Sequence, residues 1–317
     1  MRTASWIWVL ALAGCSVETD VDLASLTIVS PAPGAVFTRD QLGSSGALVA
    51  PVGVEVEVSG PIARVAIRAG DVELGDLGGG SFAAELATSG PLTLTATALD
   101  ANGIELLATS VDITVEDPAA ADCRDWLDLY RLDYAAGPDK PGVADPVTVT
   151  LPLNGITYRY SGNTSPRETL FGDCALMRSL AEAAPIVRAH GVHELVDIGI
   201  YNYRCIDQSK TPPDCAMSQH AYARAIDIAQ LVTGDGDYSV VDDWVIDPDD
   251  DTCTATTEGD KDAWLHQVIC ELKAAGVWNI VLTPNYNGDH RNHFHVDLTE
   301  DADFIERTVG GGPPADF

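Results

Sequence analysis

Basic residues are scarce in this sequence of 317 residues. It contains 18 Lys and Arg against 48 Asp and Glu, which gives a formal net charge of -30 at pH 7. Nucleic-acid phosphates are bound by patches of Lys and Arg, so this balance argues against nucleic acid as a partner. The acidic surface favours solubility and repels other anionic polymers at long range. A ligand within such a polymer would therefore have to be held by local contacts.

Long apolar runs are missing as well. After residue 15, no stretch approaches the ~20 apolar residues that a membrane-spanning helix needs. Near the N-terminus, a short apolar run over residues 6–12 follows Arg2 and ends in LAGC at residues 12–15. This end resembles the lipobox of bacterial lipoproteins, in which the signal is cleaved before a cysteine that receives diacylglycerol. The resemblance implies a signal peptide over residues 1–14.

The lipobox resemblance also implies a location. Cys15 would carry the lipid, and residues 15–24 would form a polar tether from the membrane. We therefore expect a protein of the bacterial cell envelope, anchored by lipid in the periplasm or on the outer membrane.

Cysteine pairs of the C-x-x-C kind, which are typical of zinc sites, are absent. Six cysteines follow Cys15, and all lie beyond residue 120: Cys123, Cys174, Cys205, Cys215, Cys253 and Cys270. An even number in an exported chain predicts three disulfides. We expect Cys205 to pair with Cys215, because the two would close a short loop that contains proline. The sequence leaves the other pairings open.

Residues 25–116 contain neither cysteine nor histidine. They consist of short runs that alternate apolar and polar residues, such as residues 53–59, 63–68 and 92–97. Such alternation is typical of half-buried strands, and several strands at regular spacing predict a small all-β sandwich of the Ig-like kind. This domain would space the rest of the chain from the membrane or bind a partner that the sequence does not identify.

Residues 117–122 (DPAAAD) read as a linker to a second domain over residues 123–308, followed by a disordered tail at 309–317. The apolar spacing predicts helices over residues 174–190 and 261–275 and strands over 195–203 and 277–283. Helices and strands that mix without a strict βαβ rhythm favour the α+β fold class.

Histidine is concentrated in two segments of this second domain. Four of the seven histidines lie in SQHAYARAID (residues 218–227) and HRNHFHVD (residues 290–297). Both segments combine imidazole with carboxylate, which are ligands that zinc takes. His220 and Asp227 would lie roughly 10 Å apart on one helix, so we expect the chain to turn between them. His293 and His295 would share one side of a strand, so either both bind metal or one acts on metal-bound water.

The paired motifs Ser218-x-His220-x6-Asp227 and His293-x-His295 resemble the extensin-like C-terminal family, a relative of the zinc D-Ala-D-Ala peptidases. That larger group includes lysostaphin-type endopeptidases and the hedgehog signalling domain. The resemblance covers about residues 120–300 and implies a zinc domain of that fold. It implies one Zn²⁺ per chain, with His220, Asp227 and His295 as ligands.

The resemblance also implies roles for neighbouring residues. His293 matches a helper or base, and His290 matches a further active-site histidine. Arg204 matches an arginine that binds a substrate carboxylate or the developing oxyanion. Two further roles follow from position rather than from the resemblance. Asp297 should share a strand face with His295, where it either orients a ligand histidine or is a plain residue at the strand end. Ser218 either caps the loop before His220 or contacts the ligand segment.

The sequence departs from the family pattern at two positions. Ala223 stands where glycine is frequent, and Asn292 stands where some D-Ala-D-Ala peptidases have a catalytic glutamate. The second departure makes His293 the better base and weakens the case for a carboxypeptidase.

Three ligands and an open position for water describe a catalytic zinc site. We therefore expect a zinc metallopeptidase, a carboxypeptidase or endopeptidase that hydrolyses peptide bonds of peptidoglycan. One alternative is a catalytically inactive zinc-containing module that binds the cell wall. Another is a structural envelope protein held together by disulfides. The sequence does not identify the bond that is cut.

Overall fold

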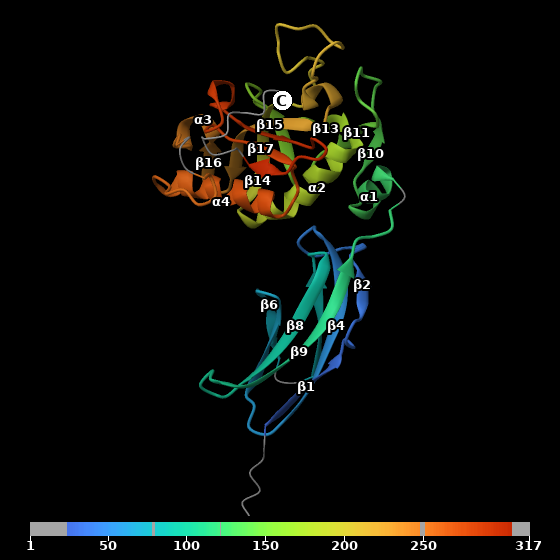
Figure 1. Ribbon diagram of the computed structural model, residues 1–317, viewed down its shortest axis with the longest axis vertical. Coiled ribbons are helices and arrows are strands. Elements are labelled where there is room, and N and C mark those ends of the chain that lie inside the picture. Colours follow the sequence, from blue (N-terminus) through green and yellow to red (C-terminus); the bar gives the residue numbers. More distant parts are fainter. Residues whose placement is uncertain (1–23, 78–79, 121, 248–250, 306–317) are drawn as a thin grey trace, which may run out of the picture. The chain divides into compact units, whose positions relative to one another are not determined.

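The computed structural model describes residues 24–77, 80–120, 122–247 and 251–305. The predicted signal peptide, Cys15, nearly all of the tether and the tail lie outside the described residues. The chain divides into two compact units (Figure 1). The first contains the described residues up to Phe37, Val52–Ala84 and Gly90–Thr114. The second contains Thr38–Pro51, Glu85–Ser89 and the described residues from Val115 onward.

The strands between residues 25 and 116 form two sheets. One sheet has four strands, β1 (Ser25–Ser30), β4 (Leu48–Ser59) and β3 (Gln41–Leu42) in this order, with β7 (Gly80–Leu86) also paired to β4. The other sheet has five strands in the order β2 (Val36–Thr38), β9 (Glu105–Glu116), β8 (Gly90–Leu99), β5 (Arg64–Ala69) and β6 (Val72–Leu77). Side chains alternate along β4, where Val52, Val54 and Val56 are buried and the residues between them are exposed. This is the pattern of a strand with one face in a core.

A short helix and a small sheet begin the second domain. Helix α1 (Cys123–Leu129) starts at Asp122, whose carboxylate accepts hydrogen bonds from the backbone of Arg124 and Asp125. It is followed by a three-stranded sheet in the order β10 (Tyr134–Ala136), β11 (Pro146–Thr150) and β13 (Thr169–Asp173).

A seven-stranded sheet carries the candidate site. Its order is β12 (Thr157–Tyr160), β14 (Val192–Gly199), β15 (Ala225–Thr233), β18 (Phe294–Asp297), β17 (Ile280–Leu282) and β19 (Phe304–Ile305). Strand β16 (Gly236–Ser239) pairs with β15 as well. Strands β15 and β18 are antiparallel neighbours, so residues distant in sequence lie opposite each other.

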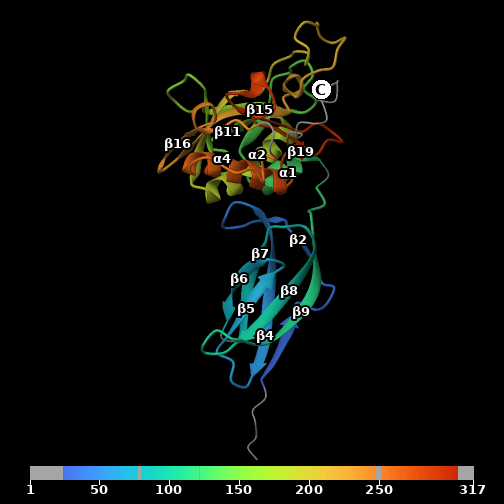
Figure 2. The ribbon, with the colours of Figure 1, turned by 60° about the vertical axis from the view of Figure 1, so that its left-hand side comes forward.

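Two long helices, α2 (Cys174–Ala189) and α4 (Asp260–Ala274), accompany this sheet, and α3 (Val240–Asp243) is a single turn (Figure 2). Leu180 of α2 and Leu272 of α4 lie in one apolar core with Leu195, Leu231 and Phe294 of the sheet. Burial of a side chain of this size contributes about 1.5–3 kcal/mol. The core therefore holds β15 and β18 in fixed register.

The predicted fold class is wrong. Of the described residues, 42% lie in strands and 18% in helices, so the chain is mostly β, with several sheets, rather than α+β. The hedgehog or D-Ala-D-Ala-peptidase-like domain implied by the motif resemblance formed part of the same prediction and is corrected with it. Strands β1 to β9 supply most of the strand residues, and residues 134–173 add four strands, β10 to β13, that are three to five residues long and were not predicted. Strands this short show too little alternation to be recognised in the sequence.

Three disulfides confirm the prediction from the cysteine count. They join Cys123 to Cys174, Cys205 to Cys215 and Cys253 to Cys270. The expected Cys205–Cys215 pair is among them. Within the described residues, no helix is both long and apolar enough to cross a membrane.

Candidate metal site

Three segments of the second domain bring His220, Asp227 and His295 together. Asp227 on β15 lies directly opposite His295 on β18, and opposed residues of antiparallel strands project to the same side. His220 lies on a short 3-10 helix, Gln219–Tyr222, which precedes β15. The chain reverses at Ala223, which has a left-handed backbone with φ 53°. The turn expected between His220 and Asp227 is therefore present, and glycine would adopt it without strain.

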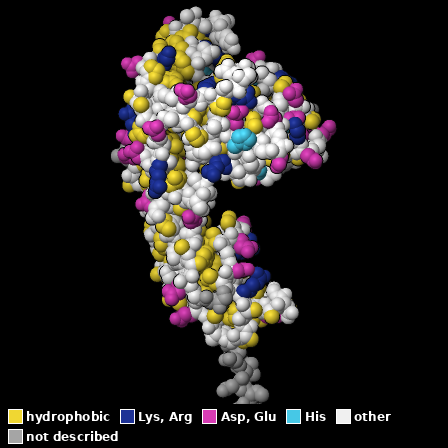
Figure 3. All heavy atoms as spheres, turned by 180° about the vertical axis from the view of Figure 1, so that it is seen from behind, with side chains coloured by type: hydrophobic (Ala, Val, Ile, Leu, Met, Phe, Trp, Pro, Cys, Tyr) yellow, Lys and Arg dark blue, Asp and Glu magenta, His cyan; other side chains and the backbone are white. Residues whose placement is uncertain are grey.

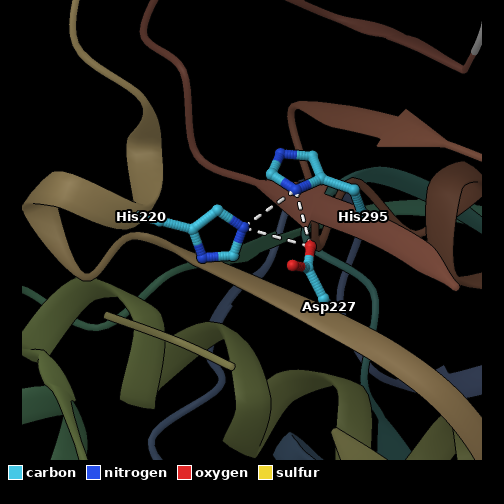
Figure 4. Close-up of side chains that lie close together, drawn as sticks. All are labelled: His220, Asp227 and His295. Carbon is cyan, nitrogen blue, oxygen red and sulfur yellow. Dashed lines mark hydrogen bonds and ion pairs between the residues drawn. The ribbon is translucent and has the colours of Figure 1, made fainter. Parts of the chain in front are cut away.

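The side-chain atoms of these residues that could bind a metal ion lie within 4.8 Å of one another (Figure 4). His220 Nε2 lies 3.1 Å from Asp227 Oδ1 and 3.2 Å from His295 Nδ1. His295 Nδ1 lies 2.8 Å from Asp227 Oδ1. Zinc bonds of about 2.0–2.1 Å place neighbouring ligand atoms of a tetrahedron about 3.3 Å apart. The chain thus has a His/Asp/His site of suitable size and chemistry for a metal ion.

The far nitrogen of each ring is held by a group that can only accept hydrogen bonds. His220 Nδ1 lies 2.9 Å from the carbonyl oxygen of Ile200. His295 Nε2 lies 3.0 Å from Asp297 Oδ2. Each far nitrogen must therefore donate, which leaves His220 Nε2 and His295 Nδ1 with lone pairs in the neutral rings. Three acceptor atoms then face one another, and only a proton or a cation between them removes their repulsion.

The ionisation of these groups follows from the same contacts in the metal-free chain. Burial raises the pKa of Asp227, but its hydrogen bonds with His220 and His295 outweigh burial and hold that pKa far below its usual value. Burial lowers the pKa of His295, but hydrogen bonds with Asp227 and Asp297 raise it to about 9. Without metal, a proton on His295 therefore supplies the positive charge that the site needs.

His293 lies just before β18, beside the three converging residues. Its Nε2 is 3.4 Å from Asp227 Oδ1, and its Nδ1 is 2.9 Å from Asn292 Oδ1. Among the described residues, the converging group has three members, and His293 is not one of them. Burial and the charges of His295 and His220 outweigh the attraction of Asp227 and lower the pKa of His293. A neutral imidazole next to the metal position is suited to act as a base.

His290 lies on a second short 3-10 helix, Gly288–His290. Its ring centroid is 5.2 Å from that of His293 and 5.7 Å from that of His295. Burial, followed by the charges of His295 and His293, lowers the pKa of His290 to about 3. The ring is therefore neutral at pH 7.

A cavity of about 590 Å³ opens onto the metal position. Arg204 lines it together with Asp227, His290, His293 and His295, so the structure brings the predicted active-site residues to one place. Ser218 also lines the cavity, and its hydroxyl accepts a hydrogen bond from the His220 backbone at the start of the 3-10 helix. Ile280, Leu282 and Phe304 add apolar side chains to the lining, and Leu282 on β17 lies directly beside His295 on β18.

The sequence did not point to three features of the site. The carbonyl of Ile200 orients His220, but no residue type reveals a backbone contact in advance. Asn287 and Asn292 bond to the rings of His290 and His293. Asn292 was noted only as a departure from the family pattern, and proximity to the histidines was the available signal for both contacts.

Comparisons with known proteins identify the family. The family described as extensin-like protein C-terminus matches residues 142–305, which is more than half of the chain and includes every residue of the site. A comparison with curated proteins gave no match.

Solved structures are only distantly similar. Fibronectin(III)-like modules of Clostridium thermocellum CbhA are 19% identical, with 29% of this chain and 94% of that chain covered and a TM-score of 0.24. An engineered protein is 24% identical, with 29% and 20% covered and a TM-score of 0.21. The apo β-glucuronidase 3 of Bacteroides uniformis is 13% identical, with 40% and 15% covered and a TM-score of 0.23. These similarities carry no weight for function, whereas the match over residues 142–305 is decisive: the chain belongs to the extensin-like protein C-terminus family.

Proposed function

We propose that this protein is a zinc-dependent peptidase that hydrolyses peptide bonds in the stem peptides or cross-links of peptidoglycan. The observation that carries the proposal is the convergence of three acceptor atoms, from His220, Asp227 and His295, at zinc-like separations. The paired motifs also resemble those of zinc D-Ala-D-Ala peptidases. The lipobox at Cys15 supports export to the cell envelope, where peptidoglycan is found.

Each residue of the site has a separate role in the proposed hydrolysis. A zinc ion in this site would lower the pKa of a water to about 7 and polarise the scissile carbonyl. His293, neutral and beside Asp227, takes a proton from the attacking water and returns it to the leaving amine. Arg204 offers fixed positive charge to a substrate carboxylate or to the oxyanion.

Single substitutions test which residues bind the metal and which act in catalysis. His220→Ala and Asp227→Ala should leave less than about a tenth of the zinc of the wild type, because two protein ligands hold the ion poorly. His293→Ala should keep its zinc and lose activity by about 10²–10⁴-fold. The measurements are metal analysis of the purified chain from Ser16 onward and release of peptides from isolated peptidoglycan.

Each outcome has a clear meaning. Full zinc content in His220→Ala or Asp227→Ala would contradict the ligand assignment. Loss of zinc in His293→Ala would make His293 a ligand. Zinc at full occupancy in the wild type, with no peptide released from several wall types, would favour a module that binds the cell wall without cleaving it.

A further inference from the structure

Asn287 stands at the edge of the cavity and contacts two hydrogen-bonding groups with one atom. Its Oδ1 lies 2.9 Å from the backbone nitrogen of Asp289, where it caps the second 3-10 helix. The same Oδ1 lies 2.7 Å from Nδ1 of His290. The side chain of Asn287 therefore ties the histidine ring to the backbone of its own turn.

This geometry determines where the proton of His290 resides. The backbone N–H of Asp289 can only donate, so the asparagine atom facing it must be the carbonyl oxygen and not the amide nitrogen. An oxygen that faces Nδ1 of His290 at 2.7 Å must accept from that nitrogen. His290 therefore carries its proton on Nδ1, and in the neutral ring Nε2 holds a lone pair.

The Nε2 atom of His290 is available to a ligand. Throughout the described part of the chain, no hydrogen bond joins it to another protein group, and the residue lines the same cavity as Arg204. A divalent cation held by His220, Asp227 and His295 would repel a second positive charge, so the ring stays neutral beside a bound metal. The cavity then offers a donor in Arg204 and an acceptor in His290.

We propose that Asn287 is a positioning residue, which holds His290 in the Nδ1–H form so that Nε2 accepts a hydrogen bond from an N–H group of the substrate. This inference rests on the proposed function, and it specifies the substrate contact: an amide or amine N–H near the scissile bond. Arg204 carries only donors and cannot make this contact.

The inference is tested by the tautomer of His290 in the zinc-loaded chain from Ser16 onward. Long-range ¹H–¹⁵N NMR spectra of protein labelled in histidine distinguish Nδ1–H, Nε2–H and the doubly protonated ring. The wild type should show Nδ1–H, and His290→Gln identifies the signals. Asn287→Asp keeps an oxygen for both partners and should keep this tautomer.

Asn287→Ser is the matched variant. Serine caps a helix well but is too short to reach the ring, so the turn should persist while the tautomer shifts toward Nε2–H. Its kcat/KM on a peptide substrate should fall by about tenfold, the equivalent of one hydrogen bond. An Nε2–H or doubly protonated ring in the wild type, or an unchanged tautomer in Asn287→Ser, would overturn the role of Asn287. A fixed Nδ1–H tautomer in a zinc-loaded protein that releases no peptide would instead refute the proposed function alone.

Discussion

At the scale of single residues, each histidine of the candidate metal site is oriented by a hydrogen bond at the ring nitrogen that faces away from the metal position. The carbonyl of Ile200 holds His220, and Asp297 holds His295. Asp297 is itself anchored, because its other oxygen accepts a hydrogen bond from the backbone of Thr299 at 2.8 Å. The ligand nitrogens are thus aimed before any ion arrives, which reduces the ordering cost of binding.

Removal of the Asp297 carboxylate should therefore weaken the metal site. Asp297→Ala is expected to raise the zinc dissociation constant by about 10–100-fold, because His295 loses its orientation and part of its basicity. Titration against a competing chelator measures this change. Glu300→Gln removes an equal charge from a side chain that is 83% exposed, and it should leave the affinity unchanged. Equal affinities for Asp297→Ala and the wild type would contradict the role of Asp297.

Zinc affinity should also depend on pH. The pKa of His295 in the metal-free chain is about 9, so zinc must displace a proton at neutral pH. The dissociation constant should fall by up to about tenfold for each pH unit between pH 6.5 and 8.5. Calorimetry in two buffers of different ionisation enthalpy would detect the release of one proton. Zinc binding that is independent of pH and releases no proton would show that His295 is not protonated in the metal-free chain.

At the scale of elements, the hairpin that precedes His220 forms a wall of the cavity. Its arms are joined by hydrogen bonds from Ile206 to Ala216 and from Ser218 to Arg204, and by the Cys205–Cys215 disulfide. Both arms contribute to the cavity lining. The loop between the cysteines is coloured yellow in Figure 1 and projects from the second domain.

Loss of this disulfide should affect the substrate more than the metal. The double variant Cys205→Ser/Cys215→Ser is expected to keep its zinc and to show a KM about three- to tenfold higher, because the cavity wall loses a constraint worth about 2–3 kcal/mol. Cys253→Ser/Cys270→Ser removes a disulfide whose cysteines do not line the cavity, and it serves as control. A similar rise of KM in both double variants would show that the effect is one of general stability.

The sequence predicted elements with strong periodicity and missed those without it. The helices expected at 174–190 and 261–275 are α2 and α4, each within one residue. The strand expected at 195–203 is shifted to Val192–Gly199, because the chain leaves the sheet after Gly199, whose φ is 155°. The motifs identified the histidines and Asp227. The Ile200 carbonyl reaches His220 through a tertiary contact, which local pattern does not encode. The contacts of Asn287 and Asn292 with His290 and His293 are local, but they depend on the backbone conformation of the turn.

At the scale of the whole molecule, negative charge is abundant but dispersed. Acidic side chains are scattered over the visible face rather than gathered in one area (Figure 3). One acidic group is placed at a cost to stability. Asp197 on β14 is fully buried, and although its Oδ1 accepts a hydrogen bond from Arg167 at 2.6 Å, its Oδ2 has no partner among the described residues.

Asp197 should make stability fall as pH rises. Burial raises its pKa to about 6 despite Arg167, whereas the unfolded value is near 3.8. The folded chain thus binds the proton of the Asp197 carboxyl more tightly than the unfolded chain does. The stabilisation that this proton gives is fully present below pH 3.8 and is lost as the pH rises through 6. Between pH 4 and pH 7, the free energy of unfolding of Asp197→Asn should rise by about 2–3 kcal/mol relative to that of the wild type. Urea unfolding at both pH values, with chelator present, measures this difference, and a constant difference would contradict the burial argument.

The central claim, that a zinc ion in the His220, Asp227 and His295 site cleaves peptidoglycan peptides, is tested most directly by a single assay. The chain from Ser16 onward is analysed for zinc and incubated with intact peptidoglycan, with and without chelator, and the released peptides are identified by mass spectrometry. We predict one zinc per chain and a release of peptides that chelator abolishes and added zinc restores. A chain that binds no zinc, or one whose release of peptides is unaffected by removal of the metal, would contradict the account.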